Sequence, residues 1–163
     1  MTALTAEELM AWVDRTHEGW RGLLAAQPEV LLLPCDVAGG GSVAGLLQHV
    51  VAVELRYAER LHGRAVSPYE QVANGSAEEL HRTHEQAFGL LRGLLAEQET
   101  DWEETIEFET RTGGRWRATR RAVLVHLLMH SVRHYAQLAT MVRQQGVKPG
   151  WPMDYLFMQG RPV

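Results

Sequence analysis

Apolar residues recur every three to four positions over four long stretches of the chain, which is the spacing of an amphipathic helix. Thr5 and Ser76 each stand three positions before a glutamate, the pattern of a capping box at a helix start, and Ser42 is a typical N-cap. We therefore predict four long helices, over residues 5–26, about 43–62, 76–97 and 119–145.

The hydrophobic period changes between the third and fourth stretches. In TIEFETRTGGRWRATR, Ile106 and Phe108 alternate with polar neighbours, and Gly113-Gly114 offers a tight turn. This pattern predicts a short β-hairpin, with residues ~104–111 paired to ~114–119. An isolated hairpin is only marginally stable, so we expect it to pack on the helices. The apolar tail WPMDYLFMQG is expected to dock as a short helix or an extended segment.

Together these elements predict an all-α fold: a four-helix bundle with a small hairpin inserted between the third and fourth long helices. The chain has 163 residues, the size of one domain, and shows no internal repeat. We therefore treat residues 1–163 as a single domain.

Composition and charge argue against a membrane protein and against a nucleic-acid-binding protein. No apolar run approaches the ~18–20 residues of a membrane span, and the N-terminus has no basic-then-apolar leader. We expect a cytoplasmic protein with no membrane partner. The net charge is −4 and there is no basic stripe, which argues against a nucleic-acid partner. A small arginine cluster is interpreted as the solvated face of the hairpin: Arg111, Arg115, Arg117, Arg120 and Arg121.

The strongest chemical signal is the run His126-x3-His130-x3-His134 in the fourth helix. Residues four apart share one helical face, so adjacent imidazoles could bind one metal ion. His130 and His134 fall on the apolar stripe, and His49 lies at the inner edge of the stripe of another helix. Three neutral imidazoles with an open coordination position would suit Zn²⁺ or Ni²⁺. On spacing alone, hydrogen-bonded core histidines remain an alternative.

The other polar candidates have weaker interpretations. We expect His17 and His62 at the surface, and His84, in the seam of the third helix, to be a hydrogen-bonded core histidine rather than a ligand. Glu54 lies about 140° round its helix from His49, which makes it a poor fourth ligand, and we expect a partly exposed carboxylate. Cys35 is the only cysteine, which excludes an internal disulfide, and we expect an incidental free thiol.

Three segments, in order, resemble the DinB-like superfamily (damage-inducible and YfiT-type proteins). VAGLLQHVVAVELRYAERLHG resembles its second helix, IEFETRTGGRWRATRRAVLVHLLMHSVRHYAQL its hairpin and fourth helix, and GVKPGWPMDYLF its closing segment. The resemblance implies a four-helix bundle and a metal triad of His49, His130 and His134, with His126 at a position that is often histidine without being a ligand. Many members have His-Arg-Gly-Gln after the second ligand of the pair, whereas this chain has His134-Tyr135-Ala136-Gln137.

The resemblance also implies a divalent-metal-dependent enzyme that activates either water, as a hydrolase, or a low-molecular-weight thiol, as an S-transferase. His126 and Gln137 are the candidate catalytic or ligand-supporting residues, and a small-molecule substrate and a homodimer are expected. The alternative is a non-enzymatic metal-binding protein or a dimeric stress-response scaffold. The thiol hypothesis requires basic or polar groups at the pocket rim, where Arg56, Arg60 and Arg133 are available.

Overall fold

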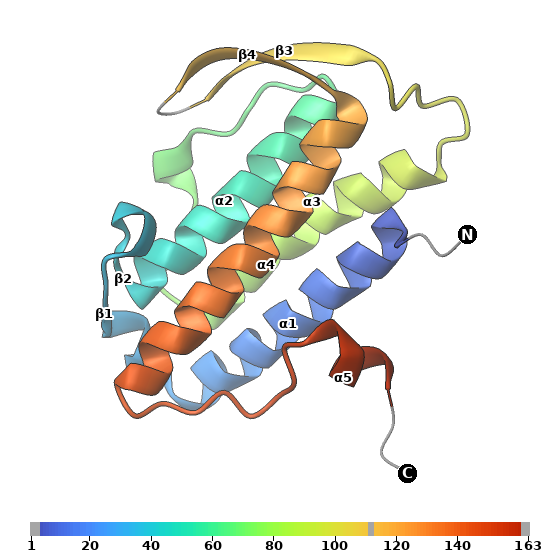
Figure 1. The fold of residues 1–163 in the computed structure, drawn as a ribbon. Helices are drawn as coiled ribbons and strands as arrows, with labels where there is room; N and C mark the ends of the chain where they lie inside the picture. The colour runs from blue at the N-terminus through green and yellow to red at the C-terminus, as the bar shows by residue number, and fades with distance from the viewer. Residues whose placement is uncertain (1–3, 111–112, 161–163) are drawn as a thin grey trace.

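The computed structural model describes residues 4–110 and 113–160, and this part of the chain is mostly helical. It contains five α-helices and the predicted hairpin (Figure 1). The helices are α1 (Ala6–Ala26), α2 (Val43–Leu61), α3 (Ala77–Ala96), α4 (Arg120–Gln144) and α5 (Tyr155–Gln159). Strands β3 (Thr105–Thr110) and β4 (Gly114–Thr119) form the hairpin, and β1 (Pro34–Cys35) pairs with β2 (Gly41–Ser42).

The helix starts follow the predicted capping residues. Thr5 and Glu8 form a complete capping box, in which each side chain accepts a hydrogen bond from the other residue's backbone N–H. At α3 the box is modified, because the Ser76 side chain accepts from the Glu79 N–H but the Glu79 carboxylate accepts from the Gly75 N–H instead of that of Ser76. Both arrangements satisfy N–H groups that a helix start leaves without partners.

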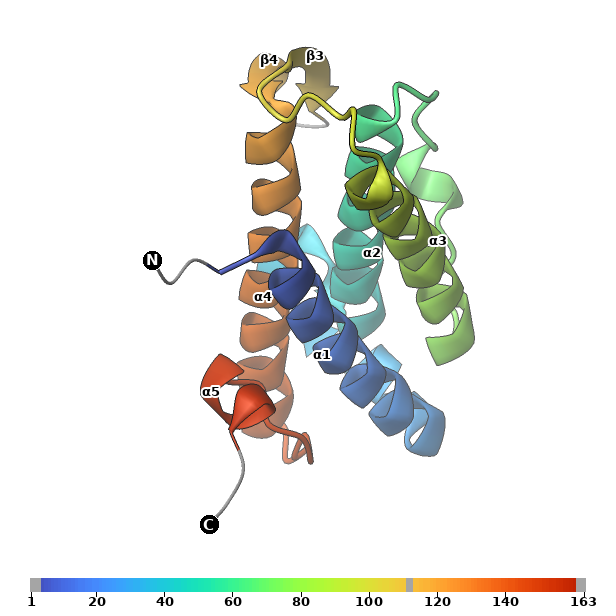
Figure 2. The same cartoon turned by 90° about the vertical axis from the view of Figure 1, so that its right-hand side faces the viewer.

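The four long helices lie side by side around one core (Figures 1 and 2). Helix α2 contacts α3 and α4 most extensively, and α1 closes the arrangement by contacting α3 and α4. Each long helix contributes fully buried side chains, for example Val13, Val50, Ala87 and Leu127. The apolar periodicity of the sequence therefore identifies the inward faces correctly.

The hairpin covers the end of the helices where α2 finishes and α4 begins (Figure 1). Its half-buried residues Ile106, Phe108 and Ala118 pack against the core. On its outer face Glu107 pairs with both Arg115 and Arg117. Beyond the strands, Arg120 pairs with Glu104 and Arg121 with Glu103. Arg115, Arg117 and Arg121 are exposed, as predicted for a solvated surface, whereas Arg120 is half-buried. Arg111 lies outside the described residues.

The C-terminal tail docks on α1, as its apolar composition predicts. The indole N–H of Trp12 donates to the Met153 carbonyl at 2.8 Å, and Arg15 donates to the Met158 carbonyl at 2.6 Å. The ring of Trp151 lies directly over Gly19, where an added Cβ would come within 2.2 Å of it. Close approach at Gly19 therefore sets the path of the tail.

None of the helices within the described residues combines the length and apolar character needed to cross a bilayer. Cys35 is 2% exposed, so the lone thiol is a buried core residue.

A pair of glycine-to-alanine substitutions tests the tail contact. Alanine is a better helix former than glycine by up to about 1 kcal/mol. At Gly22, where an added Cβ meets nothing within 4 Å, we expect Gly22→Ala to raise stability. At Gly19 we expect Gly19→Ala to lower the free energy of unfolding by about 1–3 kcal/mol, because the methyl group displaces Trp151. Urea denaturation, with limited proteolysis of the tail, measures both; a stabilised Gly19→Ala protein would contradict the contact.

Candidate metal centre

The structure brings His49, His130 and His134 together. His49 lies in the middle of α2, and His130 and His134 are one turn apart on the neighbouring α4. The Nε2 atoms of His49 and His130 are 3.0 Å apart, and each of the three residues offers a ring nitrogen within 4.8 Å of the other two. Two nitrogens bound to one tetrahedral zinc ion at 2.0–2.1 Å are separated by about 3.3 Å. The spacing of His49 and His130 is therefore close to that of a shared ion.

The electrostatics favour the neutral form of His130 and His134, the form of imidazole that binds metal. Burial, and then the neighbouring His134 and His49, lower the pKa of His130 to about 2. Burial, with His49 and Arg133, lowers the pKa of His134 to about 4. Both rings are therefore uncharged at neutral pH.

Arg133 occupies part of this site. Its guanidinium donates to the Nε2 atom of His134 at 3.1 Å and so uses the lone pair that a metal ion would need. Because Arg133 itself is exposed, its side chain has room to turn away from His134.

The two candidate catalytic residues, His126 and Gln137, lie on α4 on either side of the His130–His134 pair. His126 is exposed one turn before His130, with the two ring centroids 5.8 Å apart. Gln137 is exposed and close enough to His134 to oppose the lowering of its pKa. However, the buried Nδ1 atoms of His130 and His134 have no hydrogen-bond partner among the described residues. Gln137 therefore does not hold the His134 ring through Nδ1.

A cavity of about 530 Å³ opens beside the triad. It is lined by His49 and His130 together with residues of α2, α4 and the hairpin, among them His126. This volume falls within the range of about 300–1,000 Å³ that is usual for small-molecule sites. Two of the three triad histidines, His49 and His130, therefore lie on the wall of a ligand-sized cavity.

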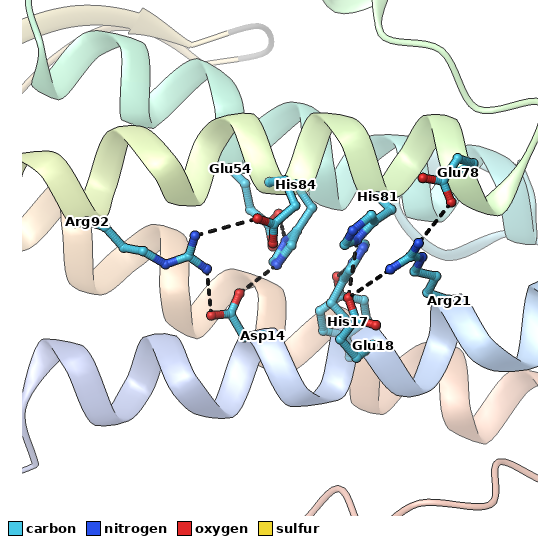
Figure 3. A network of polar contacts seen from close by, with 11 residues as sticks. Asp14, His17, Glu18, Arg21, Glu54, Glu78, His81, His84 and Arg92 are labelled. Atoms are coloured by element: carbon cyan, nitrogen blue, oxygen red, sulfur yellow. Dashed lines mark hydrogen bonds and ion pairs between the residues drawn. The ribbon is translucent and has the colours of Figure 1, made fainter.

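Glu54 is not the partly exposed carboxylate that its helical position suggested, because it is fully buried. Its Oε1 accepts from the Ser131 hydroxyl at 2.7 Å, and its Oε2 lies 2.8 Å from Nδ1 of His84. Nε2 of His84 lies in turn 2.9 Å from a carboxylate oxygen of Asp14 (Figure 3). These partners come from three other helices, so the pattern of α2 alone could not reveal them.

His84 is the charged centre of this buried network and, as predicted, a hydrogen-bonded seam histidine. Burial alone would lower its pKa, but Glu54 and Asp14 outweigh burial and raise it to about 9. Asp14, His84 and the exposed Glu85 lie close enough together to resemble a second metal site. A protonated His84 donates both N–H groups to carboxylates and has no lone pair for a metal, so the network is an ion-paired core element.

His17 is also buried, at 3% exposure, which corrects its prediction as a surface residue. Its ring stacks on His84 with centroids 3.9 Å apart, and its Nδ1 lies 2.8 Å from the Tyr135 hydroxyl. Burial and the nearby positive charge of His84 hold the pKa of His17 well below its usual value. The sequence contained a signal for this burial, because His17 follows Val13 by four positions on the apolar stripe.

His62, also predicted at the surface, is half-buried, and its Nε2 lies at hydrogen-bond distance, 2.8 Å, from the Leu90 carbonyl.

Comparison with known proteins gives one informative match. The model of the DinB family matches residues 1–161, almost the whole chain. No curated protein matches it.

Removing the charge of Glu54 tests the buried network. We expect Glu54→Gln to lower the free energy of unfolding by about 3–5 kcal/mol at pH 6, because it leaves the His84 cation with one carboxylate fewer. The raised folded-state pKa of His84 contributes stability that is complete below about pH 6.5 and lost as the pH rises through about 9. The difference from wild type should therefore shrink between pH 7 and pH 10.

Urea denaturation across this pH range measures the effect. Glu85→Gln, at an exposed position beside His84, is the matched control and should change stability by less than about 0.5 kcal/mol. A difference between Glu54→Gln and wild type that grows toward pH 10 would show that His84 is not the cation of the pair.

Proposed function

The chain belongs to the DinB family, and from this premise we propose that it holds a divalent metal ion at His49, His130 and His134 and acts as a metal-dependent enzyme. The supporting observation is the convergence of three imidazoles, two of them with lowered pKa values, beside a cavity of about 530 Å³ that His49 and His130 line. In this proposal the four long helices form the four-helix bundle implied by the resemblance, with the ligands on two facing helices.

The donor set fits such an ion. Three histidine ligands leave one coordination position open, the arrangement of catalytic rather than structural zinc sites. A bound divalent ion would supply Lewis-acid activation of water or of a thiol. Nitrogen ligands suit zinc and nickel, and we name these two as the candidate metals.

The residues of this chain would hold and orient the reactants. His49 and His130 line the cavity, so a molecule bound there lies against the triad. His126 lines the same cavity one turn from His130 and is the residue placed to accept or return a proton. Phe108 and Trp116 of the hairpin line the same cavity and supply apolar contacts for a bound molecule.

Metal content and metal affinity test the proposed site directly. We expect natively purified protein to hold about one equivalent of zinc or nickel. Loss of a partner outside the first coordination shell typically weakens metal binding 10–100-fold, so His130→Ala and His134→Ala should each weaken it by at least about 100-fold. His81→Ala, which removes a histidine of α3 outside the triad, should leave binding unchanged. Elemental analysis and chelator competition measure both effects, and metal-free wild-type protein or unchanged affinity in the triad variants would end the proposal.

Thiol dependence separates the two reactions. If the enzyme is an S-transferase, conjugation of an electrophile should require added glutathione, bacillithiol or mycothiol. If it is a hydrolase, turnover should be unaffected by thiol removal. Stoichiometric metal without either activity would favour the non-enzymatic alternative.

A further prediction concerns Arg133. Its positive charge and its hydrogen bond to Nε2 of His134 both oppose a cation at the triad. We expect Arg133→Gln to tighten zinc binding by about five- to tenfold, since removing a like charge near the surface is worth about 1 kcal/mol. Arg143→Gln, at an exposed site later on the same helix, is the matched control. Zinc affinity that is unchanged or weaker in Arg133→Gln would show that the arginine does not compete for the site.

A further inference from the structure

Two arginines of α2 line the cavity without a carboxylate partner. Arg56 donates to the backbone carbonyl of Ser67, and Arg60 donates to that of Glu109 at 2.8 Å. Neither forms an ion pair within the part of the chain that the structure describes. Several other arginines are ion-paired: Arg21, Arg92, Arg115, Arg117, Arg120 and Arg121.

The two guanidinium groups lie on the helical face that carries the triad histidine. Arg56 follows His49 by seven residues and Arg60 by eleven, which are two and three helical turns. At 1.5 Å per residue, their backbones lie about 10 Å and 16 Å from His49 along α2. A ligand that reaches from the triad toward the hairpin therefore passes these arginines.

The positive charge at this end of the cavity is held in place, and neither arginine has an ion-pair partner among the described residues. The Arg60 guanidinium lies 4.9 Å from the ring centroid of Tyr57 and 5.7 Å from that of Phe108. Burial and the nearby Arg56 lower the pKa of Arg60, and Tyr57 and Glu59 partly oppose this effect. An anion between them would offset their mutual repulsion.

The remaining wall is largely aromatic. Tyr57, Phe108 and Trp116 line the cavity together with apolar residues of α4, and Trp116 is 56% exposed, which places it at the opening. Such a wall favours a planar or apolar group, whereas the arginine fork favours an oxyanion.

We propose that this cavity binds an organic anion, with its carboxylate or phosphate group at Arg56 and Arg60 and its apolar part against Tyr57, Phe108 and Trp116. This inference deepens the proposed function, because it defines the class of substrate or thiol that would be presented to the triad. Arg56 and Arg60 are then binding and specificity residues, and their bonds to the Ser67 and Glu109 carbonyls position them.

The test uses small probes and metal-free protein, so that direct coordination by a metal cannot contribute. NMR titration with 3-phenylpropionate, the neutral 3-phenylpropanamide and phenyl phosphate compares two oxyanions with an uncharged analogue of the same shape. The Trp116 indole signal, assigned with Trp116→Phe, reports binding at the cavity. We expect 3-phenylpropionate to bind at least about tenfold more tightly than the amide, and tighter binding of phenyl phosphate would identify phosphate as the preferred oxyanion.

Variants identify the residues responsible. A hydrogen bond to a charged group is worth about 1.5–3 kcal/mol, so Arg56→Gln and Arg60→Gln should each weaken 3-phenylpropionate at least about tenfold. Arg143→Gln should not change its binding. Arg60→Lys keeps the charge without the planar fork and should bind with intermediate affinity, which distinguishes loss of charge from loosening of the hairpin. Thermal unfolding of each variant establishes that it folds.

Equal binding of acid and amide, or unchanged binding in folded Arg56→Gln and Arg60→Gln, would overturn the inference. Binding that appears only after zinc is added, and disappears in His130→Ala but not in Arg60→Gln, would also overturn it while leaving the metal site intact. Arginine-dependent anion binding in a protein that never binds metal would support the anion site and refute the proposed metalloenzyme. The two ideas can therefore fail separately.

Discussion

The arrangement of the four long helices depends on one buried charge, the imidazolium of His84. Glu54 and Asp14 hold it from α2 and α1 (Figure 3). Glu54 accepts in turn from the Ser131 hydroxyl of α4. A buried ion that loses a partner is far more costly than a lost apolar contact, so helices that slide past one another break this network first. Ser131 follows His130 directly in the chain. The contact that sets the register of α4 against α2 therefore also sets the position of a triad histidine.

The same side chain has opposite charge states in two neighbouring regions of this core. His84 is surrounded by carboxylates that raise its pKa to about 9, whereas His130 has other imidazoles and an arginine nearby and its pKa falls to about 2. Burial lowers the pKa of both rings, but only His84 has carboxylates beside it that outweigh this effect. The cluster around His84 is therefore an ion-paired element of the core, whereas the triad that contains His130 can accept a cation.

Much of the fold could be predicted from the sequence because it depends on local signals. Apolar periodicity and caps such as Thr5 placed the four long helices, and the change to a period of two placed the hairpin. Glu54 and His17 were mispredicted because their surroundings come from other helices. A carboxylate is assigned to the surface by default, and only the packed structure shows the His84 cation that makes its burial favourable. The convergence of His49 with His130 was anticipated through the family resemblance, since spacing alone left hydrogen-bonded core histidines open.

The distribution of charge around the cavity gives the site its chemical character. The chain as a whole carries a net charge of −4, and the arginines of the hairpin surface are matched by glutamates. Inside the cavity the balance reverses, because Arg56 and Arg60 face it and no carboxylate is among the residues that line it in the described chain. A low-dielectric aromatic wall strengthens the field of these two cations. An anionic molecule would therefore be attracted to this cavity, which adjoins the three imidazoles.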